Sequence, residues 1–250
     1  MSVTNPSLGL KSEAGYPSVA EAVVIAAAEA LMEETMKKYD PSHDAFHVNR
    51  VRRTALALAK SQIPLPDLLV IELSALLHDV LDKKYVSASE AADPHLFFRP
   101  FFQGVGSHVD LLSDGRAQLI VRIIENVSWT TEKRLRTENK IEPWHDSCVE
   151  LHCVQDADRL DAIGAFGILR VAAYSAAVSQ PLHVPPDSPE FSGTAIQHFH
   201  DKLLHIKDRL KTHQGRKLGA QRHQLASRAG YTRANNSDEE IDAAFLGCGE

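Results

Sequence analysis

Apolar residues recur every three or four positions along most of the chain, which is the spacing of one face of a helix. The segment 67–83 is apolar almost all round and is expected to lie in the core. Sustained alternation of apolar and polar residues, typical of a half-buried strand, is nearly absent. The pattern therefore predicts an all-α fold. Helices are expected over residues 18–39, 40–62, 67–83, 115–129, 148–180 and, as one or two amphipathic helices, 194–230.

Caps and breakers set the expected ends of these elements. Asp40 is expected to cap the helix over 40–62, with Pro41 at its first position. From Val86 to Ser113 the helical pattern weakens, and this aromatic stretch is expected to form a loop packed on the core or, alternatively, a lid. Other loops, and the flexible ends, are predicted at residues 130–147, 181–193, 1–17 and 231–250.

Composition narrows the class of protein. The 250 residues allow one large domain or two small ones, and the hydrophobic content of 44% is that of a globular chain. A net charge of −6 gives no basic field that would favour nucleic acid or membrane as a partner. Three cysteines without a CxxC pair indicate free thiols in a reducing compartment. With no secretory signal in residues 1–18, a cytoplasmic protein is expected.

His78 and Asp79 interrupt the apolar run 67–83. An ionised carboxylate buried without a partner costs several kcal/mol, so Asp79 requires a partner elsewhere in the chain. His43 and His47 lie four residues apart on the preceding predicted helix, and three acids follow in a later one. These acids are Asp156, Asp158 and Asp161, between which the spacing does not choose. Asp156 and Asp161 are expected to pair with a nearby arginine in place of binding metal.

Imidazoles and carboxylates together suit divalent metals such as Mn, Fe, Co, Ni or Zn. A core that gathers His47, His78, Asp79 and one of the later acids would hold one such ion. Three or four protein ligands leave positions open for water and substrate, and a metal-bound water loses its proton near neutral pH. The sequence therefore predicts a catalytic metal centre.

Five motifs carry a resemblance to a known family. In chain order they read "SHDAFHVNRV", "ALLHDVLDKKY", "IIENVSW", "VQDADRLDAIGAFGILR" and "FHDKLLHIKDRLKT". The chain resembles the HD superfamily of metal-dependent phosphohydrolases, and in particular small bacterial and fungal members, some described as nucleoside triphosphate pyrophosphohydrolases. The resemblance covers about residues 20–228 and implies a single helical HD domain over 18–230 with the metal in its core.

The resemblance also implies roles for individual residues. The metal ligands fall on His47, His78, Asp79 and Asp158, and Asp82 matches an acid that positions the attacking water. The implied cofactor is one divalent ion, Mn first, with Fe, Co, Ni, Zn or Mg as alternatives. Residues 86–110 depart from the compact bacterial pattern and are interpreted as an insertion, so inherited substrate choice is open there.

Phosphate recognition requires cations. Arg50, Lys83 and Lys84 are the nearest candidates in sequence, against the alternative of solvated surface charges. Residues 201–233 hold nine Lys or Arg against two acids, and we expect His198 and Lys202 to contact a triphosphate. The strip lacks interleaved aromatics, so nucleic acid is not an expected partner. Trp129 and Trp144 are interpreted as core or loop aromatics, with stacking on a nucleotide base as the alternative.

The predicted function is hydrolysis of a (d)NTP to a (d)NMP and pyrophosphate by metal-activated water, with a small-molecule nucleotide as the partner. The attack on the α-phosphorus follows from the resemblance. A 5′-nucleotidase or phosphodiesterase with the same site is the first alternative, and a non-catalytic nucleotide-binding module is the second. GxSxG, P-loop and GxGxxG motifs are absent. No membrane is expected, and the oligomeric state is open, with a homodimer as one alternative.

Overall fold

The computed structural model describes residues 15–37, 39, 44–81, 92–185 and 187–228. The described residues form α-helices and two 3₁₀ helices and no strand, which confirms the all-α prediction. The helices are α1 (Val19–Met36), α2 (Ala45–Lys60), α3 (Leu68–Leu77), α4 (Pro94–Val105), α5 (Arg116–Asn126), α6 (Trp129–Thr137), α7 (Pro143–Ser147), α8 (Val149–Asp161), α9 (Gly164–Ala177), η1 (Phe191–Gly193), α10 (Ala195–Asp201), η2 (Leu203–Arg209) and α11 (His213–Arg228).

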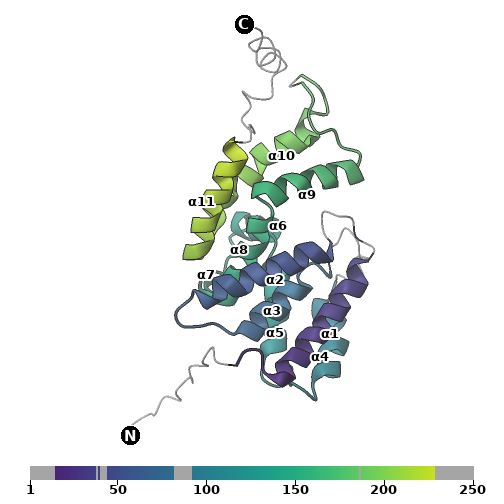
Figure 1. The fold of residues 1–250 in the computed structure, drawn as a ribbon, viewed down its shortest axis with the longest axis vertical. Helices are drawn as coiled ribbons and strands as arrows, with labels where there is room; N and C mark the ends of the chain where they lie inside the picture. Colours follow the sequence, from purple (N-terminus) through teal and green to yellow (C-terminus); the bar gives the residue numbers. More distant parts are fainter. Residues whose placement is uncertain (1–14, 38, 40–43, 82–91, 186, 229–250) are drawn as a thin grey trace.

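The helices are arranged around α3, whose ten residues are all buried. α2 packs against both α3 and α8, while α1 and α5 pack against other sides of α3. Figure 1 shows α1, α3, α4 and α5 at one end of the molecule and α9, α10 and α11 at the other. α2 and α8 lie between these two groups, so residues at the meeting of α2, α3 and α8 are in the middle of the fold.

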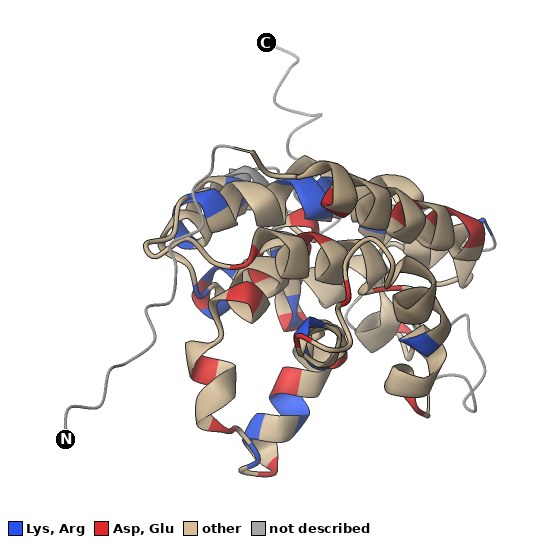
Figure 2. Ribbon diagram, turned by 90° about the horizontal axis from the view of Figure 1, so that it is seen from below, with Lys and Arg blue, Asp and Glu red and all other residues tan. Residues whose placement is uncertain are grey.

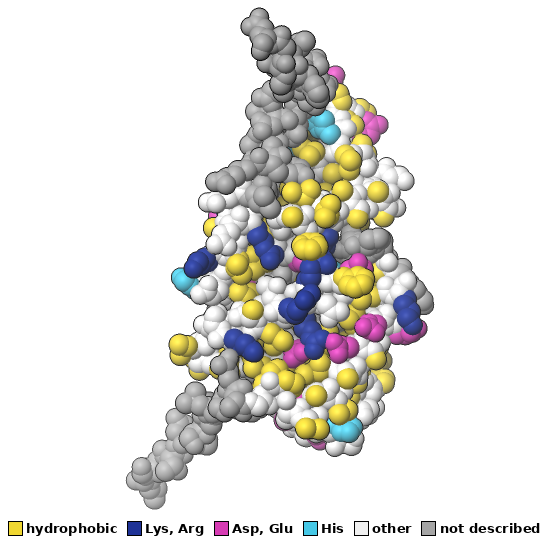
Figure 3. Space-filling model, viewed as in Figure 1, with side chains coloured by type: hydrophobic (Ala, Val, Ile, Leu, Met, Phe, Trp, Pro, Cys, Tyr) yellow, Lys and Arg dark blue, Asp and Glu magenta, His cyan; other side chains and the backbone are white. Residues whose placement is uncertain are grey.

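Charged side chains are spread over the helices. Figure 2 shows both acidic and basic residues on the ribbon. α1 carries only acidic residues among its charged positions, and α11 carries only basic ones. Basic side chains gather over α2, with acidic side chains beside them (Figure 3). Within this group Arg52 of α2 forms ion pairs with Glu29 of α1 and Glu72 of α3. These pairs connect α2 to both neighbours across the core.

α2 begins later than predicted. Its N-cap is Asp44, whose side chain accepts a hydrogen bond from the backbone N–H of His47 at 2.8 Å. The prediction of Asp40 as the cap was wrong, because Asp44 offers the same cap chemistry nearer to the apolar stripe. Asp40 and Pro41 lie outside the described residues. His47 is thereby held in the first turn of α2.

α3 ends earlier than predicted, at Leu77, and His78 and Asp79 lie in the turn that follows. The Nδ1–H of His78 donates to the carbonyl oxygen of Ala75 at 2.8 Å, which satisfies one of the carbonyls left open at the helix end. The hydroxyl of Tyr39 donates to the carbonyl of Val80 at 3.2 Å and holds the turn from the other side. The HD pair is therefore presented by a helix end and not by a helix interior.

Two segments predicted as loops contain helices. Asp93 caps α4 by accepting the N–H of Leu96 at 3.0 Å, and Phe98 and Phe102 bury one face of it. The aromatic residues that weakened the pattern are the packing face of this helix, which contacts α1 and α5. In the polar segment 130–147 the expectation of a loop was also wrong, because α6 and α7 occupy most of it.

The long helix predicted over 148–180 is two helices, α8 and α9, bent by 70°. Gly164, with φ of +75°, begins α9 in a conformation that other residues rarely adopt. At Gly167 a Cβ atom would lie 2.3 Å from the carbonyl oxygen of Ala162, so only glycine permits this approach. No described helix alone is long and apolar enough to cross a membrane; α8 and α9 pass that test only together.

Several predictions of domain organisation fall at the edge of the described residues. The predicted terminal segments 1–17 and 231–250 lie mostly or wholly outside them. The boundaries of one domain over 18–230, and the interpretation of 86–110 as an insertion, stay predictions.

Candidate metal centre and its cavity

Four of the predicted site residues converge where α2, α3 and α8 meet. The Nε2 atom of His47 lies 3.5 Å from a carboxylate oxygen of Asp79 and 3.5 Å from one of Asp158. The Nε2 atom of His78 lies 3.4 Å from Asp79 and 3.9 Å from Asp158. Ligand bonds of about 2.1 Å place neighbouring ligands of a tetrahedral metal about 3.4 Å apart. The cluster therefore fits a small divalent cation.

Burial and ligand chemistry agree with this fit. His47, His78 and Asp158 each offer one ligand atom, and these atoms lie within 4.8 Å of one another. The side chains of His47 and His78 are 1% and 2% exposed, whereas that of Asp158 is 29% exposed. Two buried imidazoles beside two carboxylates suit a borderline divalent ion. Because Asp158 is partly exposed, the cluster is open on one side.

Hydrogen bonds behind the cluster orient both imidazoles. The Nδ1–H of His47 donates to Asp161 at 2.7 Å, and that of His78 donates to the carbonyl of Ala75 at 2.8 Å. Each bond holds the proton on Nδ1 and leaves Nε2 as the atom that faces Asp79 and Asp158. This is the arrangement by which proteins orient histidines that bind metals.

Asp161 is itself held by two arginines. Arg50 donates from two nitrogens, at 2.8 Å and 2.9 Å, and Arg170 donates at 3.3 Å. Burial alone would raise the pKa of Asp161, but its bonds with His47 and Arg50 outweigh burial and hold this pKa well below the usual range. Burial opposes the charged form of His47, yet Asp161 and Asp79 raise its pKa. The imidazole therefore sits in a negative environment.

A cavity of about 1120 Å³ opens beside the cluster. His78, Asp79 and Asp158 line it, so the candidate ligands face this space. The volume exceeds that of an ordinary small-molecule site. The remaining wall includes two acids, Glu125 and Asp201, and a larger group of basic side chains: Arg134, Arg159, Arg170, His198, Lys202 and Arg209.

The predicted substrate-binding residues fall into three groups. His198 and Lys202 line the cavity. Arg50 pairs with Asp161 and stacks over the ring of Phe166, 4.4 Å from its centroid; it is not among the described residues that line the cavity. Asp82, Lys83 and Lys84, like His43, lie outside the described residues. The catalytic and substrate-binding roles of all these residues stay predictions.

Two acids of α8 have partners that the sequence indicated only in part. The expected pairing of Asp161 with an arginine is confirmed, but its bond to His47 was missed. The three-residue spacing of Asp158 and Asp161 was the available signal, because it places both on one side of α8. Asp156 has a different partner from the expected arginine: it accepts from the backbone N–H groups of Lys211 and Thr212.

Three further cavity residues were not singled out as site residues from the sequence. Trp129 begins α6, Arg159 follows Asp158 on α8, and Arg209 ends η2. All three line the cavity. Arg159 had a signal in the sequence, its position next to a candidate ligand, and Trp129 had a weaker one, as an aromatic able to stack on a base.

Comparisons with known proteins place this chain. No family model matches the sequence. The protein YpgQ of Bacillus subtilis is 34% identical over 186 residues, which cover 72% of this chain and 78% of YpgQ. A solved structure described as an HD-superfamily hydrolase, from Bacillus thuringiensis, is 25% identical, covers 83% of this chain and 93% of that one, and has a TM-score of 0.56.

The chain belongs to the YpgQ family, within the HD superfamily. The superfamily assignment drawn from the sequence motifs is thus confirmed. A structure of Bacillus subtilis YpgQ in complex with ADP shares the fold, with a TM-score of 0.61 at 23% identity over 84% of this chain and 93% of that one. In this HD-superfamily chain the His and Asp cluster at the meeting of α2, α3 and α8 is the candidate metal centre.

Proposed function

We propose that this chain is a metal-dependent phosphohydrolase that acts on nucleotides, with one divalent ion held by His47, His78, Asp79 and Asp158. The observation that carries the proposal is the convergence of these four side chains, with both Nε2 atoms directed at the carboxylates, beside a large cavity that His78, Asp79 and Asp158 line. A bound divalent ion would polarise a phosphoryl oxygen and lower the pKa of a water molecule.

The protein supplies orientation and charge. Asp161 and the Ala75 carbonyl keep the two imidazoles in one tautomer. Arg170, His198 and Lys202 line the cavity, where positive charge would stabilise the charge that develops on a phosphoryl group. We retain Asp82 as the residue that positions the attacking water, and Lys83 and Lys84 as substrate-binding candidates.

Two relatives support this assignment. The Bacillus thuringiensis protein is described as a hydrolase of the superfamily, and YpgQ has been crystallised with ADP. We further propose a nucleoside triphosphate as the substrate, cleaved at the α-phosphorus to a monophosphate and pyrophosphate, with Mn as the metal. The family resemblance of the sequence motifs supports this finer assignment.

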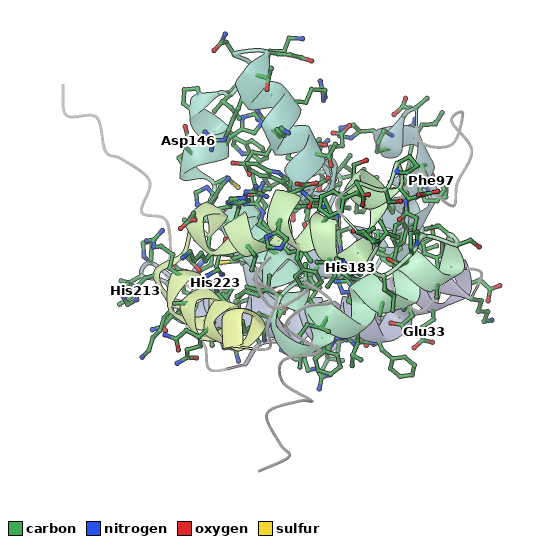
Figure 4. The ribbon with its side chains drawn as sticks, turned by 90° about the horizontal axis from the view of Figure 1, so that it is seen from above. Glu33, Phe97, Asp146, His183, His213 and His223 are labelled. Atoms are coloured by element: carbon green, nitrogen blue, oxygen red, sulfur yellow. The ribbon has the colours of Figure 1, made fainter. Side chains whose placement is uncertain are left out.

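The test is a product analysis. The protein is stripped of metal with a chelator, reloaded with Mn²⁺, and incubated with nucleoside tri-, di- and monophosphates while phosphate and pyrophosphate are measured separately. We expect pyrophosphate from triphosphates, dependent on metal and lost in Asp79→Ala. Asp146→Ala is the matched control, because Asp146 is an exposed aspartate of α7 at the edge of the molecule (Figure 4).

Other outcomes select the alternatives. Phosphate released from monophosphates would identify a 5′-nucleotidase in place of a pyrophosphohydrolase. Nucleotide binding without any product, in folded protein loaded with Mn²⁺, Co²⁺ or Zn²⁺, would overturn the enzymatic proposal in favour of a binding module.

A further inference from the structure

A tryptophan and two arginines form a second feature of the cavity wall. The guanidinium carbon of Arg209 lies 3.9 Å from the ring centroid of Trp129, and that of Arg159 lies 5.6 Å from it. The three residues come from α6, η2 and α8, so three separate elements bring them together. All three line the same cavity as His78, Asp79 and Asp158.

Glu132 of α6 holds this group from behind. It pairs with Arg159 at 2.5 Å, with Arg136 at 2.7 Å and with Lys211 at 3.4 Å. The side chains of Glu132 and Arg159 are 6% and 4% exposed. Burial would raise the pKa of Glu132, but the charges of Arg159, Arg136 and Lys211 lower it to about 2. Glu132 is therefore ionised, and Arg159 is held rigidly.

The charges around this group do not balance. Arg136, Arg159, Arg209 and Lys211 bring four positive charges to it. Glu132 is its one buried carboxylate that pairs with these cations. Two further acids lie near the group: Asp208 is exposed, and Asp156 is occupied by backbone N–H groups of residues 211 and 212. Burial and the nearby charge of Arg159 lower the pKa of Arg209. An excess of positive charge remains beside the buried Arg159, although Arg136 is half exposed.

Both cavity arginines also carry unused donors. The Nε of Arg159 and the Nη1 of Arg209 are buried and have no hydrogen-bond partner among the described residues. A buried donor of a charged group that lacks a partner costs more than one of a neutral group. An anion in the cavity would satisfy both the unused donors and the excess charge.

We propose that Arg159 and Arg209, held by Glu132 and Trp129, bind the terminal phosphates of the nucleotide. The proposal deepens the proposed function and rests on it. Arginine binds phosphate oxygens through paired donors, a geometry that lysine does not offer. The metal centre then engages the phosphate that is attacked, and the arginine pair engages the phosphates that leave. A triphosphate would gain binding energy from both the metal centre and the arginine pair, whereas a monophosphate would gain it from the metal centre alone.

Stacking of a nucleotide base on Trp129 is the competing interpretation. A guanidinium group already lies over the Trp129 ring, and a neutral base would leave the positive charge unbalanced. The charge of the site therefore favours phosphate over base.

A binding experiment tests the proposal without turnover. The chain has two tryptophans, and each stacks with an arginine at 3.9 Å: Trp129 with Arg209, and Trp144 with Arg122. The second pair does not line the cavity, which makes it a matched control within the described residues. Trp144→Phe leaves only the fluorescence of Trp129, and Trp129→Phe leaves only that of Trp144. Inorganic pyrophosphate is titrated into each metal-free variant.

We expect a saturable change in emission from the Trp144→Phe variant and none from the Trp129→Phe variant. Adenosine, which has a base and no phosphate, should produce no change in either. A saturable response to adenosine and none to pyrophosphate would overturn the proposal in favour of base stacking. No response to either compound would overturn it as well.

Kinetics provide the second test. In Arg209→Gln, we expect kcat/KM for a nucleoside triphosphate to fall by about 10- to 100-fold, as expected for lost charge-assisted bonds. The kcat/KM for a monophosphate should change far less. If monophosphates are not hydrolysed, their affinity is measured as inhibition of triphosphate hydrolysis, and it too should change far less. Arg122→Gln should match the wild type. Arg209→Lys keeps the charge but loses the paired donors of the guanidinium group, so its kcat/KM for a triphosphate should lie between those of Arg209→Gln and Arg122→Gln. This variant replaces Arg209→Gln in the test if Arg209→Gln does not fold.

The two proposals fail in different ways. If pyrophosphate perturbs Trp129 but no nucleotide is hydrolysed, the phosphate site stands and the proposed function is wrong. If triphosphates are hydrolysed and Arg209→Gln behaves like Arg122→Gln, the proposed function stands and the phosphate site is wrong.

Discussion

Asp161 of α8 and Glu132 of α6 are both buried carboxylates that pair with arginines. The site beside Asp161 suits a cation, whereas the site beside Glu132 suits an anion. Asp161 is enclosed by Arg50 and Arg170 and uses its remaining bond to orient His47. The imidazole then faces further carboxylates, and the result is a place for a cation. Around Glu132 the cations outnumber the acid, and two of them line the cavity.

The comparison shows that an ion pair does not by itself reveal what a site binds. The deciding observation is which charged side chains the cavity wall presents next to each buried pair. At the metal centre the groups that reach it include Asp79 and Asp158; near Glu132 they are Arg159 and Arg209. The following substitutions break one side of this comparison at a time.

The largest effect is expected from Asp158→Asn, which replaces a proposed metal ligand with an amide of the same shape. Loss of a group that only hydrogen-bonds a metal ligand costs about 10- to 100-fold in metal affinity or activity. Loss of the ligand Asp158 should reduce both the metal retained after dialysis and the metal-dependent turnover by more than that. Metal per chain is measured by atomic emission, with Asp146→Asn as the exposed control. Retention of both metal and turnover would exclude Asp158 as a ligand.

Glu132→Gln should weaken the fold itself. The change leaves the buried Arg159 without its charged partner, so we expect the free energy of unfolding to fall by about 3–5 kcal/mol in urea titrations at neutral pH. Glu138→Gln is the matched control at the C-cap of α6, since Glu138 pairs with Arg134 and Lys140 at the surface. Equal stability of the two variants would contradict the structural role of Glu132.

The same variant makes a prediction about pH. Folding lowers the pKa of Glu132 from 4.5 to about 2, so this group stabilises the fold above its unfolded pKa. That contribution is lost as the pH falls from about 4.5 to about 2. Stability of the wild type should therefore drop more steeply across this range than that of Glu132→Gln. Parallel pH profiles would show that Glu132 is not held in its charged form by its partners.

Asp161→Asn should lower metal affinity although Asp161 is not a proposed ligand, because Asp161 orients the ligand His47. The amide cannot match the charge that orients His47, so metal affinity should fall by about 10- to 100-fold, measured by competition with a fluorescent chelator. Asp156→Asn is the matched control, because Asp156 is buried on the same helix but bonds to residues 211 and 212. Equal losses of metal affinity in both variants would indicate a general effect on α8.

The smallest effect is expected from Arg50→Gln. Arg170 still holds Asp161, so metal affinity should fall by less than about 10-fold, and KM for nucleotides should not change. The sequence suggested instead that Arg50 contacts the substrate. A rise in KM with unchanged metal affinity would support that earlier interpretation against the pairing seen in the structure.

The sequence allowed the helical class to be predicted from local spacing, and His47, His78 and Asp79 to be singled out by their residue types. Asp158 was chosen over Asp156 and Asp161 only through the family resemblance, because the spacing did not distinguish the three acids. The ends of helices were predicted less well. Asp44 replaced Asp40 as the cap of α2, because several residues nearby offer similar cap chemistry, and α3 ended at Leu77, before the HD pair. Periodicity did not distinguish an amphipathic α4 from an aromatic loop.

Partners across long separations could not be predicted from one sequence. Asp161 bonds to His47 over 114 positions, and Arg159 bonds to Glu132 over 27. The three-residue spacing of Asp158 and Asp161 placed Asp161 on the side of the candidate ligand, but it did not identify His47 as its partner. Both pairs depend on how whole helices pack. The arginine and tryptophan group on the cavity wall was missed for the same reason.

Asp158, Arg159 and Asp161 lie within four consecutive positions of α8. Successive residues of a helix point about 100° apart, so the three side chains reach the cavity, Glu132 of α6 and His47 of α2. One stretch of backbone therefore sets the spacing between the metal centre and the first phosphate-binding arginine. That spacing is insensitive to the movement of loops, and a phosphate chain of different length could be accommodated only through Arg209, which η2 carries.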